Sequence, residues 1–138
     1  MSSIDLTVGA TIATPWRGPI SVTSLLAETV PVARAALLTI AQLGSTMTYG
    51  QLSTALDRRY PPINLGSVLD LVSYDCRLRG EPSLAALVIR GDTNEPGYAW
   101  IGDATAERRR CYERWAWPER PVVARADNVQ AFAPDTDG

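Results

Sequence analysis

MTYGQLSTALDRRYPPINLGSVLDLVSYDCRLRG, residues 47–80, contains two amphipathic patterns separated by a pair of prolines. The first pattern covers residues 49–60 and places three apolar side chains on one face: Leu52, Ala55 and Leu56. The second covers residues 63–80, ends at a glycine suited to a helix C-terminus, and repeats apolar residues at helical spacing: Leu65, Val68, Leu69, Val72 and Cys76. We therefore predict two helices joined by a short turn.

A further helix is predicted directly before this pair. Residues 31–43 begin with a proline, which suits a first helical turn, and place four positions near one face: Val32, Ala35, Leu38 (or Ala36) and Ile40. Residues 45–48 are predicted to be short and extended. Residues 1–30 are rich in small and polar residues and form an N-terminal extension, with one candidate strand at 6–13 and a short helical turn at 22–30.

Two strand patterns and a last helix follow the central pair. Residues 83–90 predict a short strand, and residues 98–102 predict a returning strand after a turn-rich loop, which makes a β-hairpin. Residues 104–117 predict a helix capped by Asp103, with three side chains facing inward: Cys111, Tyr112 and Trp115. The tail contains one more candidate strand at residues 121–132.

The order of these elements predicts an α+β fold, specifically a winged helix-turn-helix. Three helices precede a β-hairpin wing, and a C-terminal helix follows it. The predicted domain covers residues 31–117, between the N-terminal extension at 1–30 and the C-terminal tail at 118–138. Several unrelated folds have the same element order, so the pattern leaves them open.

The composition excludes most catalytic and metal-binding sites. The chain has 138 residues, 46% of them hydrophobic, a net charge of −2, no histidine and two cysteines. A zinc site usually needs four Cys or His ligands, and the common nucleophilic triads need an imidazole. We therefore expect no metal site, no cofactor and no catalytic residues. No pair of carboxylates is placed for acid–base catalysis, so the chain is predicted not to be an enzyme.

The two cysteines and the N-terminus suggest where the protein is found. Cys76 and Cys111 could form one disulfide, but no signal-peptide pattern marks the chain for export. Two reduced, buried thiols in a cytoplasmic protein are therefore expected. No segment approaches the roughly 20 apolar residues of a membrane span. If Cys111 is exposed, its arginine neighbours would lower its pKa.

The sequence also resembles a known family of DNA-binding domains. A Thr-Tyr-Gly turn at residues 48–50, Leu65-Gly66 near the start of the next helix, and Pro-Gly-Tyr at 96–98 occur in the corresponding order. On these residues, the chain is similar to the C-terminal winged-helix domain of the alkylguanine-DNA alkyltransferases and their non-enzymatic alkyltransferase-like relatives. The resemblance covers roughly residues 31–115 and implies a winged-helix fold that binds double-stranded DNA.

The departures from this family argue against its enzymatic activity. Where the family places its acceptor cysteine after a proline, this chain has Ser83 after Pro82. The histidine and arginine that should follow are Leu84 and Ala85, and the family's arginine finger aligns with Ile63. The resemblance therefore implies a fold without the alkyl-transfer reaction.

The candidate DNA-binding residues follow from the helix-turn-helix interpretation. In that motif the second helix of the pair enters the major groove. Removing its apolar positions leaves an outward face that would hold Asn64, Ser67, Asp70, Tyr74 and Arg77. The predicted DNA-binding set contains side chains that can reach bases or phosphates: Tyr49, Arg58, Arg59, Asn64, Ser67 and Arg77. An exposed mixed-charge face without DNA is the alternative, and Tyr49 is as well suited to packing between helices.

The sequence therefore predicts a non-enzymatic winged-helix DNA-binding protein, a small regulator or accessory factor, whose near-neutral charge makes its DNA binding weak. Residues 31–117 contain ten arginines and nine acids, a net charge of +1. Each phosphate contact adds affinity by releasing counterions, so few contacts imply weak, salt-sensitive binding. The alternative function is a protein-protein interaction module of a viral or bacterial accessory protein, a winged-helix scaffold without DNA binding. Its partner-binding residues would be Trp115 and Trp117, near the proline-rich end.

Overall fold

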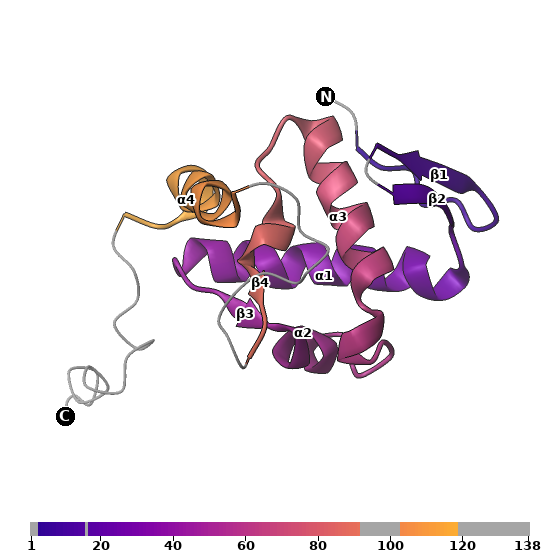
Figure 1. Ribbon diagram of the computed structural model, residues 1–138, viewed down its shortest axis with the longest axis horizontal. Helices are drawn as coiled ribbons and strands as arrows, with labels where there is room; N and C mark the ends of the chain where they lie inside the picture. The colour runs from indigo at the N-terminus through magenta and orange to yellow at the C-terminus, as the bar shows by residue number, and fades with distance from the viewer. Residues whose placement is uncertain (1–2, 16, 92–102, 119–138) are drawn as a thin grey trace.

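The computed structural model describes residues 3–15, 17–91 and 103–118. Figure 1 shows helices around a long central helix, with the β1–β2 pair at the periphery and the β3–β4 pair among the helices, so the α+β class is confirmed. The elements along the chain are β1 Thr11–Thr14, β2 Arg17–Ser21, α1 Ser24–Gln42, β3 Met47–Thr48, α2 Tyr49–Ala55, the 3-10 turn η1 Pro62–Asn64, α3 Gly66–Arg79, the 3-10 turn η2 Leu84–Leu87, β4 Val88–Ile89 and α4 Ala104–Trp115.

Helix α1 is the central element, and α2, α3, η2 and α4 all pack against it. It begins at Ser24, where the Thr23 side chain accepts the Leu26 N–H at 3.1 Å. The predicted start at Pro31 is wrong, because α1 continues through this proline. A proline lacks the N–H that an interior helical position donates, so the packing of the buried face of α1, with Val30 and Ala33 on either side of Pro31, maintains the helix here. The predicted domain boundary after residue 30 would cut α1.

The buried face of α1 also differs from the predicted one. The core positions are spaced three or four residues apart and include Leu26, Val30, Ala33, Leu37 and Ala41. The predicted inward residues Val32 and Ala35 are exposed instead. By length and composition alone, α1 is the one helix in the described residues that could cross a membrane. The earlier start at Ser24 gives it 19 residues, and its buried apolar positions belong to the hydrophobic core.

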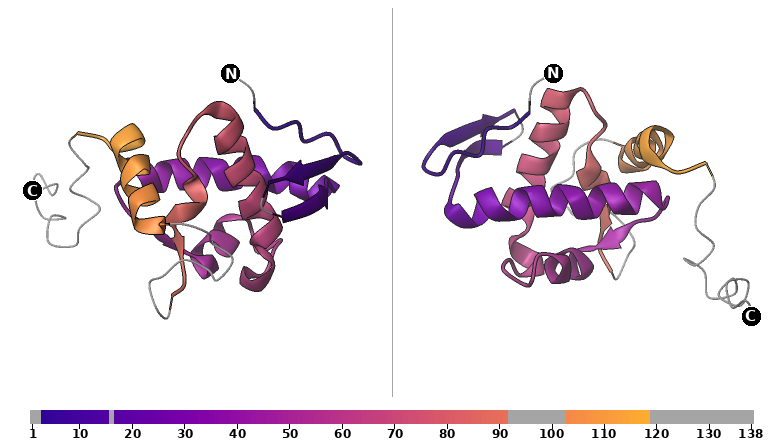
Figure 2. Two further views of the ribbon diagram at one scale, coloured as in Figure 1. Left: turned by 45° about the horizontal axis from the view of Figure 1, so that its top comes forward. Right: turned by 180° about the vertical axis from the view of Figure 1, so that it is seen from behind.

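The N-terminal extension forms a β-hairpin beside α3. Strands β1 and β2 are antiparallel, with Ile12 opposite Ile20. The candidate strand at residues 6–13 is therefore shifted toward β1, and the short helical turn at 22–30 is instead the start of α1. Figure 2 shows the hairpin on the flank of α3 in both views, and β1 contacts α3.

Helix α2 begins with a complete capping box. The Thr48 hydroxyl accepts the Gln51 N–H at 3.0 Å, and the Gln51 side chain accepts the Thr48 N–H at 2.9 Å. The helix ends at Ala55 rather than at residue 60, and Ala55 is exposed instead of buried. The extended segment predicted before it is confirmed by β3.

Replacing Thr48 with alanine should lower the free energy of unfolding by about 1 kcal/mol, because alanine lacks the hydroxyl that accepts the Gln51 N–H. Urea unfolding followed by circular dichroism measures this change. Thr54→Ala is the matched control, since the exposed Thr54 hydroxyl only donates back to the Gly50 carbonyl within the helix. Equal destabilisation by the two changes would show that the cap has no special role.

Helix α3 begins at Gly66, preceded by η1, so the predicted helix at 63–80 starts three residues too early. Its predicted core residues are all buried: Leu65, Val68, Leu69, Val72 and Cys76. The predicted stop at Gly80 is also confirmed. Gly80 has a φ of 73°, and the Glu81 N–H donates to the Cys76 carbonyl at 2.8 Å, which closes the last turn.

The predicted strand at residues 83–90 is mostly wrong. Residues 84–87 form the 3-10 turn η2, and only Val88–Ile89 form a strand, β4. Strand β4 pairs with β3 in parallel, Met47 opposite Val88. The predicted returning strand at 98–102 and the candidate strand at 121–132 lie outside the described residues, so the wing stays a prediction.

Helix α4 confirms its prediction in both its cap and its inward face. The Asp103 carboxylate accepts the Ala106 N–H at 3.1 Å. Cys111 is fully buried, and Tyr112 and Trp115 pack against the core. The Tyr112 hydroxyl also donates to the Ser45 carbonyl at 2.7 Å, which attaches α4 to the end of α1.

Candidate functional site

The turn between α2 and α3 has an unusual backbone. Asp57 and Arg58 have φ values of 59° and 57°, the left-handed region that residues other than glycine seldom adopt. Each such residue costs on the order of 1–2 kcal/mol. The Arg58 N–H donates to the Ser53 carbonyl at 2.8 Å, and the buried Ser53 hydroxyl donates to the Tyr60 carbonyl at 2.6 Å. These bonds hold residues 57–64, the α2–α3 corner, in a defined shape.

The α2–α3 corner presents both polar and apolar side chains to solvent. Arg58 and Asn64 are exposed, and the Ile63 side chain is 90% exposed. The Arg59 guanidinium forms an ion pair with the Glu28 carboxylate of α1. The structure therefore brings three of the predicted DNA-binding residues together here: Arg58, Arg59 and Asn64.

The other predicted DNA-binding residues lie elsewhere. Ser67, in the first turn of α3, is half-buried, and Tyr49 packs against the core. Arg77 is at the opposite end of α3, about 20 Å from Asn64 at a helical rise of about 1.5 Å per residue. The structure therefore does not gather all six predicted residues at one place.

Helix α3 has little free surface for reading a groove. Six of its residues are buried, and Arg77 alone is exposed by more than about a third. Helix α1, η2 and strand β1 all pack against it. The predicted outward residues Asp70 and Tyr74 are only half-exposed. A recognition helix needs a polar face that enters the major groove, and the contact with β1 narrows that face.

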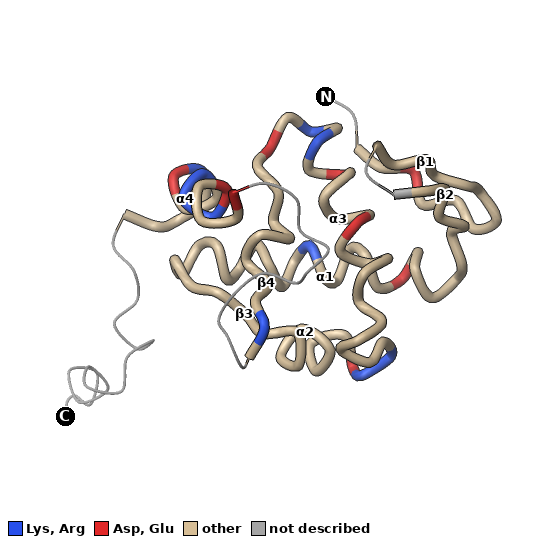
Figure 3. Tube along the Cα trace, in the orientation of Figure 1, with Lys and Arg blue, Asp and Glu red and all other residues tan. Residues whose placement is uncertain are grey.

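The arginines of the described residues are mostly engaged within the protein. Figure 3 shows the basic segments at separate places, on α4, at the C-terminal end of α3 and at the α2–α3 corner. On α4, Arg110 pairs with Glu107 at 2.6 Å, and the Arg108 Nε donates to the Ala86 carbonyl at 2.6 Å. The exposed arginines with no ion pair to a described residue lie on different elements: Arg58, Arg77 and Arg109.

A small apolar pocket lies between α1 and the end of α2, beside the α2–α3 corner. Its volume is about 170 Å³, and its lining residues are Thr29, Val32, Ala55, Leu56, Asp57 and Arg59. The Val32 side chain is 47% exposed at this position. The Glu28–Arg59 ion pair links the two sides next to it. This pocket was not found from the sequence, because the face of α1 that lines it was predicted to be inward.

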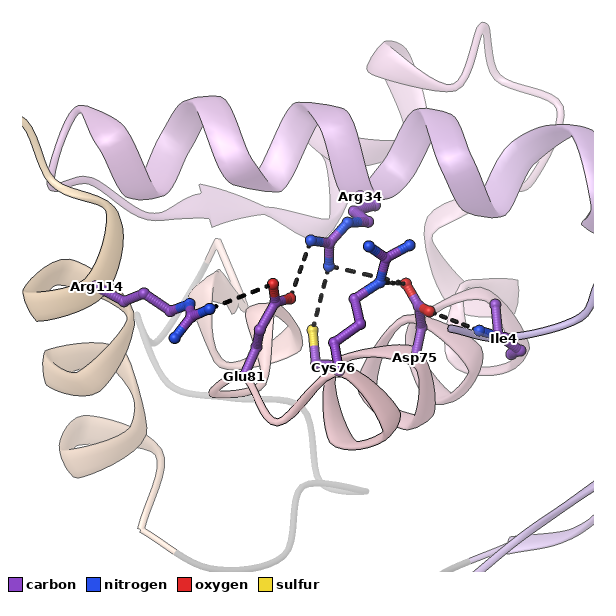
Figure 4. Close-up of polar contacts among 7 residues, drawn as sticks. Ile4, Arg34, Asp75, Cys76, Glu81 and Arg114 are labelled. Atoms are coloured by element: carbon purple, nitrogen blue, oxygen red, sulfur yellow. Dashed lines mark hydrogen bonds and ion pairs between the residues drawn. The ribbon is translucent and has the colours of Figure 1, made fainter. Parts of the chain in front are cut away.

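A cluster of charged side chains joins four parts of the chain (Figure 4). The Arg34 guanidinium of α1 lies between two shielded carboxylates, 2.9 Å from Glu81 and 3.8 Å from Asp75. Arg79 pairs with Asp75 at 3.0 Å, and Arg114 of α4 lies 3.8 Å from Glu81. The side chains of Asp75 and Glu81 are 4% and 11% exposed, so Arg34 neutralises charge where water screens little.

The same cluster holds the N-terminal segment. The Ile4 N–H donates to the Asp75 carboxylate at 2.8 Å, from a residue 71 positions away in the sequence. Asp75 therefore connects the N-terminal extension, α1 and its own helix. Its partners are fixed by the fold, and no surface for a ligand is left at its 3% exposed position. We interpret the cluster as structural.

Both thiols are buried and free. Burial raises the pKa of the Cys76 thiol from 9.0 to about 11, partly opposed by the Leu84 N–H and Arg34. Burial, then the neighbouring Glu107 carboxylate, raises the pKa of Cys111 from 9.0 to about 12. The sequence predicted a lowered pKa for Cys111 only if its thiol is exposed, and the thiol is buried. A protonated thiol is a weak nucleophile.

Ser83, at the position of the family's acceptor cysteine, is fully engaged. Its hydroxyl lies 2.8 Å from the Ser73 hydroxyl, and its N–H donates to the Glu107 carboxylate at 2.7 Å. Its carbonyl accepts the Cys111 thiol at 3.3 Å. Among the described residues, no group of three or more His, Cys, Asp or Glu side chains could hold a metal ion.

The predicted partner-binding tryptophans differ in exposure. Trp115 packs against the core and carries the Arg114 guanidinium 5.6 Å from its ring centroid. Trp117 is 43% exposed, and its backbone N–H donates to the Gln42 carbonyl at the end of α1. Of these two tryptophans, Trp117 is therefore the one that offers a large apolar surface to a partner.

No family model, curated protein or solved structure matches the chain. The function must therefore be argued from the geometry of this chain. Its most distinctive surface is the α2–α3 corner with the adjoining pocket. The exposed apolar residue there, Ile63, was recognised from the sequence only as the position of a missing arginine, because exposure cannot be read from residue type.

Proposed function

We propose that the chain is a non-enzymatic protein-protein interaction module on a winged-helix scaffold, and that the α2–α3 corner is its recognition surface. The observation that carries this proposal is the 90% exposed Ile63 beside an apolar pocket of about 170 Å³. Exposed apolar side chains next to a concave surface are typical of protein interaction sites. The raised pKa of both thiols and the engaged Ser83 hydroxyl support a role without catalysis.

The order of the helices supports the winged-helix scaffold. Helices α1, α2 and α3 precede β4, which is the position of a first wing strand in a winged helix, and β4 pairs in parallel with β3 from between α1 and α2. A hydrophobic core with reduced thiols is also consistent with a cytoplasmic protein. The resemblance to the alkyltransferase-like family remains part of this proposal.

Double-stranded DNA is the second candidate partner, because the N-terminus of α3 lacks a side-chain cap. The cap residue Leu65 makes no side-chain hydrogen bond, whereas α1, α2 and α4 are capped by Thr23, Thr48 and Asp103. Uncapped backbone N–H groups attract phosphate, and Arg58 and Asn64 lie nearby in sequence. The scattered free arginines make this candidate weaker than a protein partner.

Fluorescence anisotropy of a labelled random duplex distinguishes the two candidates. We expect no binding at about 200 mM salt and little at about 50 mM, because few phosphate contacts are available. Steep salt-dependent binding that Arg58→Ala weakens for every sequence alike would favour DNA instead. Arg109→Ala is the control, since it removes an equally exposed arginine on α4.

Cross-linking in the source cell tests the protein interaction directly. Wild-type protein and Ile63→Glu are compared for the proteins they capture, with Val8→Glu as the control for an added charge at another exposed apolar site. The proposal predicts that Ile63→Glu loses its partner and that Val8→Glu keeps it. Capture of the same proteins by all three would contradict a role for the corner.

A further inference from the structure

We propose that the α2–α3 corner binds a second copy of this chain, in a weak two-fold dimer that inserts each Ile63 into the other copy's pocket. This inference rests on the proposed function and names the partner. It combines an exposed apolar side chain, an apolar pocket beside it and a patch of balanced charge.

The Ile63 side chain and the pocket have matching chemistry. Ile63 is an aliphatic side chain with 90% of its surface exposed, and it does not line the pocket of its own chain. The pocket volume of about 170 Å³ is similar to that of an apolar cavity of about 150 Å³ that accepts benzene. Its lining includes the aliphatic side chains of Val32, Ala55 and Leu56, next to Asp57 and Arg59.

The position of these two features allows a reciprocal contact. The 3-10 turn η1, which contains Ile63, packs against α2, and the end of α2 lines the pocket. The turn that carries Ile63 and the pocket therefore both adjoin α2. A two-fold axis places the same patch on both sides of an interface, so each copy supplies one isoleucine and one pocket.

The charges of the patch favour its own copy over a charged partner. Glu28 and Asp57 are negative, Arg58 and Arg59 are positive, and the sum is zero. The Glu28–Arg59 pair is satisfied within the chain, which leaves Asp57 and Arg58, adjacent and both exposed. In a two-fold contact, Asp57 faces Arg58 of the partner subunit, and the reverse pair forms as well. A strongly acidic or basic partner would gain nothing from this patch.

The small size of the corner limits the affinity. Stable interfaces usually bury at least about 1,200 Å², and a single turn with one pocket provides less. We therefore expect a dissociation constant of about 10–100 μM.

Sedimentation velocity of the full chain from about 5 to 500 μM tests the dimer. The wild type should shift from monomer to dimer, Ile63→Glu should weaken the dimer at least about tenfold, and Val8→Glu should leave it unchanged. Circular dichroism melts confirm that each variant is folded. A wild type that stays monomeric throughout, or equal dimerisation of Ile63→Glu, would overturn the proposal.

Exchanging the charges of Asp57 and Arg58 provides a second test. A variant that is merely unfolded would not regain dimerisation when the second substitution is added. Asp57→Arg and Arg58→Asp should each weaken the dimer, and the double variant should restore it. Both residue types already occupy left-handed backbone here, so the exchange places each in a conformation that its neighbour adopts. Failure of the double variant to recover dimerisation would contradict the proposed contact. If the wild type is monomeric but Ile63→Glu still loses a cellular partner, only the second copy is excluded, and the interaction module remains.

Discussion

Arg34→Met should lower the free energy of unfolding by about 3 kcal/mol, because it leaves two shielded carboxylates without their shared counter-ion. The side chains of Asp75 and Glu81 are 4% and 11% exposed, and the Arg34 guanidinium lies within 4 Å of both. Asp75 keeps Arg79 and the Ile4 N–H, whereas Glu81 keeps only Arg114 at 3.8 Å among the ion pairs described. Urea unfolding at neutral pH measures the loss.

Two control variants separate the charge effect from the loss of side-chain packing. Arg77→Met removes an exposed arginine from the end of α3 and should change stability by less than about 0.5 kcal/mol. In a protein that already carries Glu81→Gln, Arg34→Met should lower the free energy of unfolding by a smaller amount, because one of the two carboxylates no longer needs neutralising. If Arg34→Met and Arg77→Met had equal effects, the cluster would contribute no more than a surface charge.

Helix ends were predicted correctly where a residue next to the helix end forms the cap itself. Asp103 and Gly80 each satisfy orphan groups within a few residues, so their roles follow from sequence spacing alone. Pro31 led to a wrong start for α1, because proline is common in the first turn of a helix. In the structure, the contacts of α1 with four other elements outweigh the missing N–H of this proline. Residues 83–90 misled the prediction because an apolar run does not distinguish a buried 3-10 turn from a strand.

The candidate site was less predictable because it depends on distant segments. Sequence placed Arg58 and Arg59 in the turn before α3, and the structure agrees. It gave no sign that Arg59 pairs with Glu28, 31 residues earlier, or that Val32 lines a pocket with Leu56. Such pairs are set by how α1 crosses α2. The same applies to Arg34, whose partners in α3 and in the segment after it are more than 40 residues away.

The free energy of unfolding should fall by about 2–3 kcal/mol between pH 8 and pH 10, because both buried thiols resist ionisation. Cys76 and Cys111 have pKa values raised to about 11 and about 12, from 9.0. Between these values the unfolded chain loses thiol protons that the folded chain keeps, so it binds fewer protons and stability falls as pH rises. Each thiol contributes up to about 1.4 kcal/mol per pH unit, and neither contributes below pH 8.

Urea unfolding at pH 8, 9 and 10 under reducing conditions measures this slope. Cys76→Ala and Cys111→Ala each remove one titrating group, so each should reduce the fall by about half even though each also lowers stability at pH 8 by leaving a small cavity. Tyrosines of the unfolded chain also begin to ionise near pH 10, and their share remains in the double alanine variant. A fall that is equally steep in the double variant would show that the thiols are not the groups responsible, because no other change distinguishes the two proteins.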